Sequence, residues 1–334
     1  MTARRTLGLL LLCGALAVVA LLRLLATRSL DGTLHLGWPG AELGQYRTGA
    51  VASATLAGAL LGVAGALLQG LLRNPLASPF VLGVSSGAGC GVAVAVALST
   101  TMAGAAATTS APLSAPLLPA TVGALAALGA VLALGRRNGV SDPTTVVLAG
   151  VIVGAIAAAG TMLAESALPL SRRGEISAWM LGRVPESPDT TALALSACAL
   201  AASLAVAVAV GRRLDASALS DDEARSVGVP VHHTRLVVLA TAGLATAASV
   251  VLCGPIAFVG LIAPHVARGA VGPTHRTLCV ASAIAGAALL LAAEAARQFI
   301  HLGTGRLPVG ALTALVGGVA FLWLLRRTAG GWQA

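Results

Sequence analysis

The sequence predicts an all-α, polytopic integral membrane protein with about ten transmembrane helices, and three observations carry this prediction. Of the 334 residues, 57% are hydrophobic and 10% are charged, whereas soluble domains carry about 25% charged residues. The apolar residues fall into runs of the length that a transmembrane helix needs. The 40 Gly and the 3% of aromatic residues are typical of membrane helices that pack closely through small residues.

Ten apolar runs are the candidate spans. The first follows Arg4 and Arg5 like a signal peptide, but nine runs behind it favour an uncleaved first span. The run 255–271 is short and contains Pro255 and Pro264, so a broken or tilted helix is expected there. In chain order the runs are 6–22, 48–72, 80–98, 117–135, 144–164, 190–211, 236–253, 255–271, 277–296 and 307–325.

The basic residues indicate the orientation. All 21 are Arg. With ten spans both termini lie on one side, which then carries 13 of these Arg residues and leaves 8 for the other. The positive-inside rule makes the side with 13 cytoplasmic, together with both termini.

Composition also excludes several functions. A P-loop needs Lys in G-x-x-x-x-G-K-[ST], and the chain has no Lys, so any ATP must be hydrolysed by another subunit. The net charge of +9 comes from Arg at the ends of apolar runs, which indicates topology signals rather than nucleic-acid binding. The five Cys lack a C-x-x-C pattern and the His lack ligand spacing, so no metal, cofactor or catalytic residue is predicted.

A polar interruption, RNPLASP at 73–79, separates the second and third runs. Arg73 is the single charged residue between Thr48 and Gly135. The Asn-Pro and Ser-Pro steps favour a tight turn.

Gly residues repeat every four positions around this turn, which predicts close helix packing. A packed hairpin is one interpretation. The other is a pathway lined by Ser85, Ser86 and Gly87.

Residues 212–235 form the longest polar segment. Ser220 followed by Glu223 predicts a capping box, Asp221 and Asp222 suit a helix start, and Gly228 suits its end. A helix of about two turns is unstable alone, so it must pack on its own bundle or on another subunit.

Two groups near span ends are candidate functional residues. Glu294 lies deep in the ninth run, where it is a functional group by default or an i,i+3 partner of Arg297 near the outer interface. Pro264 frees backbone carbonyls that His265 or Arg268 could satisfy.

Four segments resemble the FecCD family, the membrane permeases of bacterial ABC importers for iron–siderophores, haem and cobalamin. They are AGALLGVAGALLQGLLRNPLASPFVLGVSSGAG at 57–89, LSDDEARSVGV at 219–229, CGPIAFVGLIAPHVARGAVGPTHR at 253–276 and LPVGALTALVGGVAFLWLL at 307–325. The sequence departs from the family at Glu294, where Asp is frequent, at Arg306, where Glu precedes Leu-Pro, and at 45–48, where Arg-Leu-Pro-Arg is common.

The resemblance implies a permease subunit in the bacterial inner membrane, with one transmembrane domain over 1–334 and a cytoplasmic coupling loop at 214–234. It implies two cytoplasmic ATP-binding subunits, a second copy or homologous permease, and an extracytoplasmic substrate-binding protein as partners. The cargo would be an iron–siderophore, haem or cobalamin.

The resemblance also suggests roles for particular residues. Those of the ATPase-coupling loop are Leu219, Ser220, Asp221, Asp222, Glu223, Ala224, Arg225, Val227 and Gly228, among which Ala224, Arg225 and Val227 are the expected interface. The outer docking candidates are Arg47, Arg297 and Arg306, although solvated loop charges are the alternative. The pathway or gate candidates are Ser85, Ser86, Gly87, Pro264 and His265.

Two other classes of function are weighed against this one. An ion-coupled secondary transporter also uses broken helices, but it needs intramembrane coupling residues, which are nearly lacking in this sequence. An intramembrane protease would need a paired nucleophile and base or a metal set, and the few polar residues predict neither.

Overall fold

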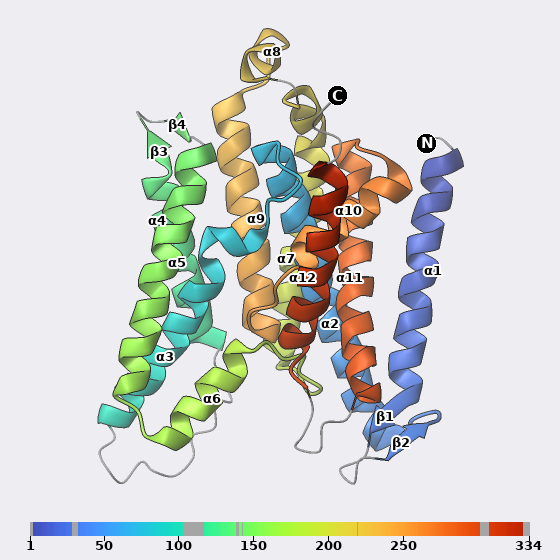
Figure 1. The fold of residues 1–334 in the computed structure, drawn as a ribbon, viewed down its shortest axis with the longest axis vertical. Coiled ribbons are helices and arrows are strands. Elements are labelled where there is room, and N and C mark those ends of the chain that lie inside the picture. The colour runs from blue at the N-terminus through green and yellow to red at the C-terminus, as the bar shows by residue number, and fades with distance from the viewer. Residues whose placement is uncertain are drawn as a thin grey trace.

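The computed structural model describes residues 3–28, 33–102, 117–137, 140–141, 143–218, 220–300 and 307–329. These residues form a bundle of helices with two short antiparallel ribbons (Figure 1). The end of the bundle that carries α8 (Asp221–Ser226) is called the α8 end, and the opposite end, with α6 (Leu170–Met180), the far end. Helix α1 begins and α12 ends at the α8 end.

The remaining elements follow the predicted runs closely. The helices are α1 (Ala3–Leu25), α2 (Ala41–Leu72), the 3-10 turn η1 (Pro79–Leu82), α3 (Val84–Met102), α4 (Leu117–Leu134), α5 (Pro143–Ser166), α7 (Thr190–Ala216), α9 (Val231–Cys253), α10 (Val259–Val271), α11 (His275–Phe299) and α12 (Val309–Ala329). The ribbons pair β1 (Ala26–Arg28) with β2 (Leu34–Leu36), and β3 (Arg136–Arg137) with β4 (Val140–Ser141).

Seven described helices are long and apolar enough to cross a membrane: α1, α2, α4, α5, α7, α9 and α11. The all-α membrane fold is therefore confirmed. Helices α3, α10 and α12 have shorter apolar stretches, so the count of ten spans stays a prediction.

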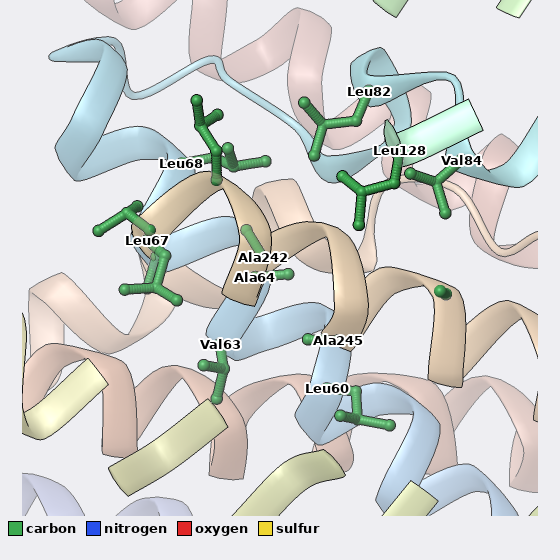
Figure 2. Packing of buried hydrophobic residues seen from close by; sticks show 14 of the residues in the cluster. Leu60, Val63, Ala64, Leu67, Leu68, Leu82, Val84, Leu128, Ala242 and Ala245 are labelled. Carbon is green, nitrogen blue, oxygen red and sulfur yellow. The ribbon is translucent and has the colours of Figure 1, made fainter. Parts of the chain in front are cut away.

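Helix α2 lies at the centre of the bundle. Its small residues permit close contact with α11, because a Cβ added at Gly58 would lie 2.3 Å from the carbonyl oxygen of Gly286. Its larger residues form the main apolar core, where Figure 2 shows Leu60, Val63 and Leu67 beside residues of α9. The outer helices instead expose apolar side chains such as Leu118 and Leu163, as lipid contact requires.

Helix α10 is shorter than the predicted run 255–271. The backbone leaves helical geometry at Gly254, where φ is 71°, and α10 starts only at Val259. Its 13 residues extend about 20 Å, less than the ~30 Å of a bilayer's hydrocarbon core. The predicted broken helix is confirmed, and the break lies at 254–258, with Pro264 inside the helix.

Candidate functional site

Helix α8 is built as its sequence predicts. The Ser220 hydroxyl accepts a hydrogen bond from the Glu223 amide at 3.1 Å, and three acidic residues fill the first turn. Gly228 follows the helix with φ of 80°, a left-handed conformation that favours Gly. The N-terminal cap at Ser220 is thus confirmed.

One carboxylate anchors α8 to the bundle. Asp221 Oδ1 accepts a hydrogen bond from Arg73 Nη2, and its Oδ2 accepts one from Arg235 Nη2, both at 2.5 Å. Arg73 also donates from Nε to the carbonyl of Ser217 at 2.6 Å. We call Arg73, Asp221 and Arg235 the α8 clamp. Arg73, the lone charge of its apolar region, therefore holds the loop against α2.

The electrostatics of the clamp favour its charged form. Desolvation opposes ionisation of Asp221, but the hydrogen bond from Arg73 and the positive charges of Arg235, Arg73 and Arg225 outweigh it. The result is that the pKa of Asp221 lies below its ordinary value. At neutral pH the carboxylate is ionised and holds both guanidinium groups.

The outer surface of α8 is exposed. Asp222 and Arg225 form an i,i+3 ion pair at 2.8 Å, and both side chains are more than half exposed. Val227 is 69% exposed. Ala224, also expected at the interface, is fully buried and packs within the chain. Leu219 lies outside the described residues.

A second polar contact joins α7 and α11 beside the clamp. Asp215 Oδ1 accepts a hydrogen bond from the His275 amide at 2.9 Å and lies 2.7 Å from His275 Nδ1. Gly70 of α2 packs directly on this imidazole, since an added Cβ would lie 2.3 Å from Nε2. Asp215 thus satisfies the backbone amide of His275, the first residue of α11. Within the described ranges, no three His, Cys, Asp or Glu could hold a metal ion together.

Gln69 supplies the polar contacts of α10. Its Nε2 donates to the carbonyl of Leu261 at 3.1 Å and to that of Ala77 at 3.4 Å. Its Oε1 accepts a hydrogen bond from Arg268 Nη2 at 3.2 Å. The prediction that His265 or Arg268 serves the carbonyls freed around Pro264 stays a prediction. At the Leu261 carbonyl the side-chain donor is Gln69, whose amide oxygen accepts from Arg268.

The gate candidates belong to two different packing interfaces. Ser85 is buried in α3, and Gly87 packs on α4, where an added Cβ would lie 2.6 Å from the Gly123 carbonyl oxygen. Pro264 is buried in α10, and His265 on the same helix is exposed. Helix α3 packs mainly on α4 and α5, whereas α10 packs on α11 and α2. Gly87 therefore supports the packed-hairpin interpretation. Ser86 is half-buried on α3.

Two of the three docking candidates are internal. Arg47 is 6% exposed, and its Nη1 donates to the carbonyls of Leu24, Leu25 and Gly37 at 2.5, 3.2 and 3.0 Å. Arg297 is equally buried. A docking contact needs an exposed guanidinium group, so the burial of these two side chains does not support the predicted role, which stays a prediction. Arg306 lies outside the described residues.

Arg297 belongs to a cluster of four charges at the far end. Glu294 Oε2 lies 2.7 Å from Arg297 Nε, which confirms the i,i+3 pair. Arg23 of α1 bridges Glu294 at 3.2 Å and Glu186 of the α6–α7 connection at 3.3 Å, and Arg297 lies 3.8 Å from Glu186. Two positive and two negative charges balance, as burial requires.

An apolar cavity of about 390 Å³ lies between α4, α7 and α9. Small side chains line it, including Ala199, Ala247 and Ala248, with a few hydroxyl groups such as those of Thr121 and Ser203. It contains none of the predicted gate residues.

A model of the FecCD transport family matches residues 7–327. The chain belongs to the FecCD transport family. The match covers every helix that the structure describes except the first residues of α1 and the last of α12.

Relatives of this FecCD-family chain carry names from three transport systems. It is 35% identical over 210 residues to the cobalamin import system permease protein BtuC of Halobacterium salinarum, 62% of this chain and 55% of that protein. It is 46% identical over 116 residues to the Fe(3+) dicitrate transport system permease protein FecD of Escherichia coli, 35% and 36% of the two chains. It is 32% identical over 208 residues to the hemin transport system permease protein HmuU of Yersinia pestis, 62% and 61%. Each match therefore spans less than two thirds of the relative.

A solved structure shares the fold of the FecCD-family chain over nearly its full length. It is an ABC transporter of the metal-chelate type in an inward-facing conformation, with a TM-score of 0.79 and 24% identity, and it covers 96% of this chain and 98% of its own.

Sequence reasoning missed the partners of several polar residues in this FecCD-family chain. Arg73 and Gln69 are polar residues in an otherwise apolar region. Their position could have indicated that each has a polar partner elsewhere in the chain. Glu186 and Arg23 gave no local signal, because the groups that they contact are distant in the sequence.

Proposed function

We propose that the protein is the membrane-spanning permease subunit of an ABC importer in the bacterial inner membrane. It would form the pathway for an iron–siderophore complex, with haem and cobalamin as the other cargo classes. The observation that carries this proposal is α8, a short helix fixed at its base by the clamp while Asp222, Arg225 and Val227 remain exposed. A six-residue helix cannot be stable alone, and its open face suits a docking partner.

In this proposal two cytoplasmic ATP-binding subunits supply the energy. The chain has no Lys, so it contains no P-loop of its own. Each ATPase would receive one α8, from this chain and from a second copy or homologous permease. The exposed apolar faces of α5 and α12, with Ile156, Leu163 and Leu315 among them, offer surface for lipid or for that second permease.

A substrate-binding protein would dock at the far end. Because Arg47 and Arg297 are buried, we propose Arg183 as a contact in their place, along with the earlier candidate Arg306. Arg183 is exposed on the α6–α7 connection, and its backbone amide donates to the carbonyl of Cys253 at 2.7 Å. Its fixed position would let it orient an acidic partner.

Co-purification from membranes in mild detergent tests the assignment. The cognate ATPase should accompany the natural chain and be lost with Arg225→Glu on α8. Arg183→Glu is the matched control, because it reverses an exposed charge at the far end and should leave the ATPase bound. Retention of the ATPase by Arg225→Glu would remove Arg225 from the interface.

The same preparation distinguishes the proposed ABC importer from the alternative, an ion-coupled secondary transporter. If no ATPase accompanies the natural chain and uptake persists after ATP depletion with the ion gradient intact, the importer proposal is wrong. The cluster of four charges at the far end would then be the first group to test for ion coupling.

A further inference from the structure

The last turn of α2 contacts two parts of the molecule that are distant in sequence. Gln69 and Arg73 lie four residues apart, which is about one helical turn. Arg73 closes α2 in the left-handed region, with φ of 48°. Gln69 is 3% exposed, so the contacts that it makes are internal.

On one side this turn holds α8. Arg73 donates to Asp221 and to the carbonyl of Ser217, so it contacts both the first residue of α8 and the loop that precedes it. Hydrogen bonds between charged groups are about twice as strong as neutral ones. A displacement of α8 therefore acts directly on Arg73.

On the other side the turn holds α10. Pro264 has no N–H and its ring crowds the preceding turn, and Gln69 donates to the carbonyl of Leu261 in that turn. Backbone contact reinforces this bond, because a Cβ added at Gly65 would lie 1.7 Å from the carbonyl oxygen of Gly260. Helices α2 and α10 are packed without intervening space there.

Backbone and side-chain hydrogen bonds tie this turn of α2 to the loop that follows it. The Asn74 amide donates to the carbonyl of Gln69 at 3.2 Å, and the Ala77 amide donates to the carbonyl of Asn74 at 3.1 Å. The Asn74 side chain accepts a hydrogen bond from the Leu76 amide at 2.9 Å. These bonds connect residues 69–77 from the end of α2 into the loop that follows it.

From these contacts we infer that the last turn of α2 transmits movement of α8 to α10, with Arg73 and Gln69 as the positioning residues at its two ends. This inference rests on the proposed function, in which ATPase subunits move α8. The inference adds a route by which the movement of α8 reaches α10, which packs on the central helix α2.

The first test uses the complete complex in proteoliposomes with its ATPase and loaded binding protein. The measured quantity is ATP hydrolysed per cargo molecule transported. Arg73→Gln should raise this ratio at least about tenfold, the factor expected from loss of the charge-assisted hydrogen bond to Asp221, because the bond to the Ser217 carbonyl is lost as well. Arg235→Gln is the matched control, because it removes an equally short bond to the same carboxylate from α9 instead of α2.

The second test follows α10 directly. Exposed Cys13 and Cys198 are replaced by Ala, and exposed His265 is changed to Cys as a reporter. Its modification rate by a thiol reagent should differ between nucleotide-free and ATP-trapped complexes. Gln69→Met, similar in length but without the amide, should abolish that difference while ATP hydrolysis continues. Gln298→Met, at another buried Gln on α11, should preserve it.

The outcomes separate the two proposals. Equal ratios for Arg73→Gln and Arg235→Gln, or an unchanged nucleotide response in Gln69→Met, would overturn the route through α2 and leave the importer assignment intact. A natural complex without ATP-dependent uptake would overturn both.

Discussion

At the scale of single residues, the partners of each charge decide what it does. Asp221 is shared by guanidinium groups from α2 and α9, so one carboxylate ties the loop to two helices. At the far end Glu294 is fully buried between Arg23 and Arg297. Each of these two sites leads to a test.

The clamp should weaken as the pH falls into the acidic range. The pKa of Asp221 is lowered in the folded protein, so its stabilising contribution is fully present above the unfolded value of about 3.9. It is lost as pH falls through the folded pKa. A spin label at Ser226→Cys should keep constant mobility from neutral pH down to about 5 and become more mobile below about 4. With Asp221→Asn added, the label should be mobile throughout; a label that stays immobile would contradict the clamp.

Removing the central carboxylate of the far-end cluster should be costly. Glu294→Gln leaves Arg23 and Arg297 with only the partly exposed Glu186. Breaking a buried ion pair costs about 3–5 kcal/mol, which thermal unfolding in detergent would register as a lower Tm. The control is Glu175→Gln, which removes the more exposed partner of Arg172 and should cost below about 1 kcal/mol. Equal Tm shifts would show that the cluster is not buried.

At the scale of secondary-structure elements, small residues control which helices touch. Helix α2 approaches α11 at Gly58 and Gly62 and approaches α10 at Gly65, where carbonyl oxygens occupy the space of a side chain. Such contact allows a short helix like α10 to be held in the bundle although it cannot cross the bilayer. The repeated Gly residues of α2 therefore leave room for the backbones of α11 and α10.

Gly65→Ala should destabilise the protein strongly. Its Cβ would lie 1.7 Å from the Gly260 carbonyl oxygen, so α2 and α10 would have to separate. Gly129→Ala in α4 is the control, because nothing lies within 4 Å of its added Cβ and Ala favours a helix over Gly by about 1 kcal/mol. Monodisperse protein in detergent and its Tm provide the measurement. A stable Gly65→Ala protein would show that this contact is looser than described.

At the scale of the whole molecule, the bundle has two chemically different ends. The α8 end carries the clamp, the exposed Arg225 and the start of α11, whereas the far end carries the buried charge cluster and α6 (Figure 1). The distribution of Arg along the sequence predicts that the α8 end is cytoplasmic.

Cysteine labelling should confirm this orientation. In a chain with Cys13 and Cys198 replaced by Ala, Arg183→Cys should react with a membrane-impermeant thiol reagent applied from outside the cell. Arg225→Cys should react only after the membrane is opened. The reverse pattern would invert the topology and place α8 away from any cytoplasmic ATPase.

The sequence by itself determined the properties that depend on near neighbours. Apolar runs predict membrane helices because hydrophobic transfer is a property of each segment. Ser220 predicts a cap, and Pro255 and Pro264 predict a broken helix, because these effects act within a few residues. Motifs from 57 to 325 also indicated the family, which the comparisons show.

Only the tertiary structure decided which distant groups meet. Arg73 and Asp221 are 148 residues apart, Gln69 and Leu261 are 192 apart, and Arg23 and Glu186 are 163 apart. The family resemblance suggested Arg47 and Arg297 as outer docking residues, but in the fold they are buried against carbonyls and carboxylates. The physical reason is that a charged group in an apolar bundle must find a partner wherever the packed helices bring one within reach.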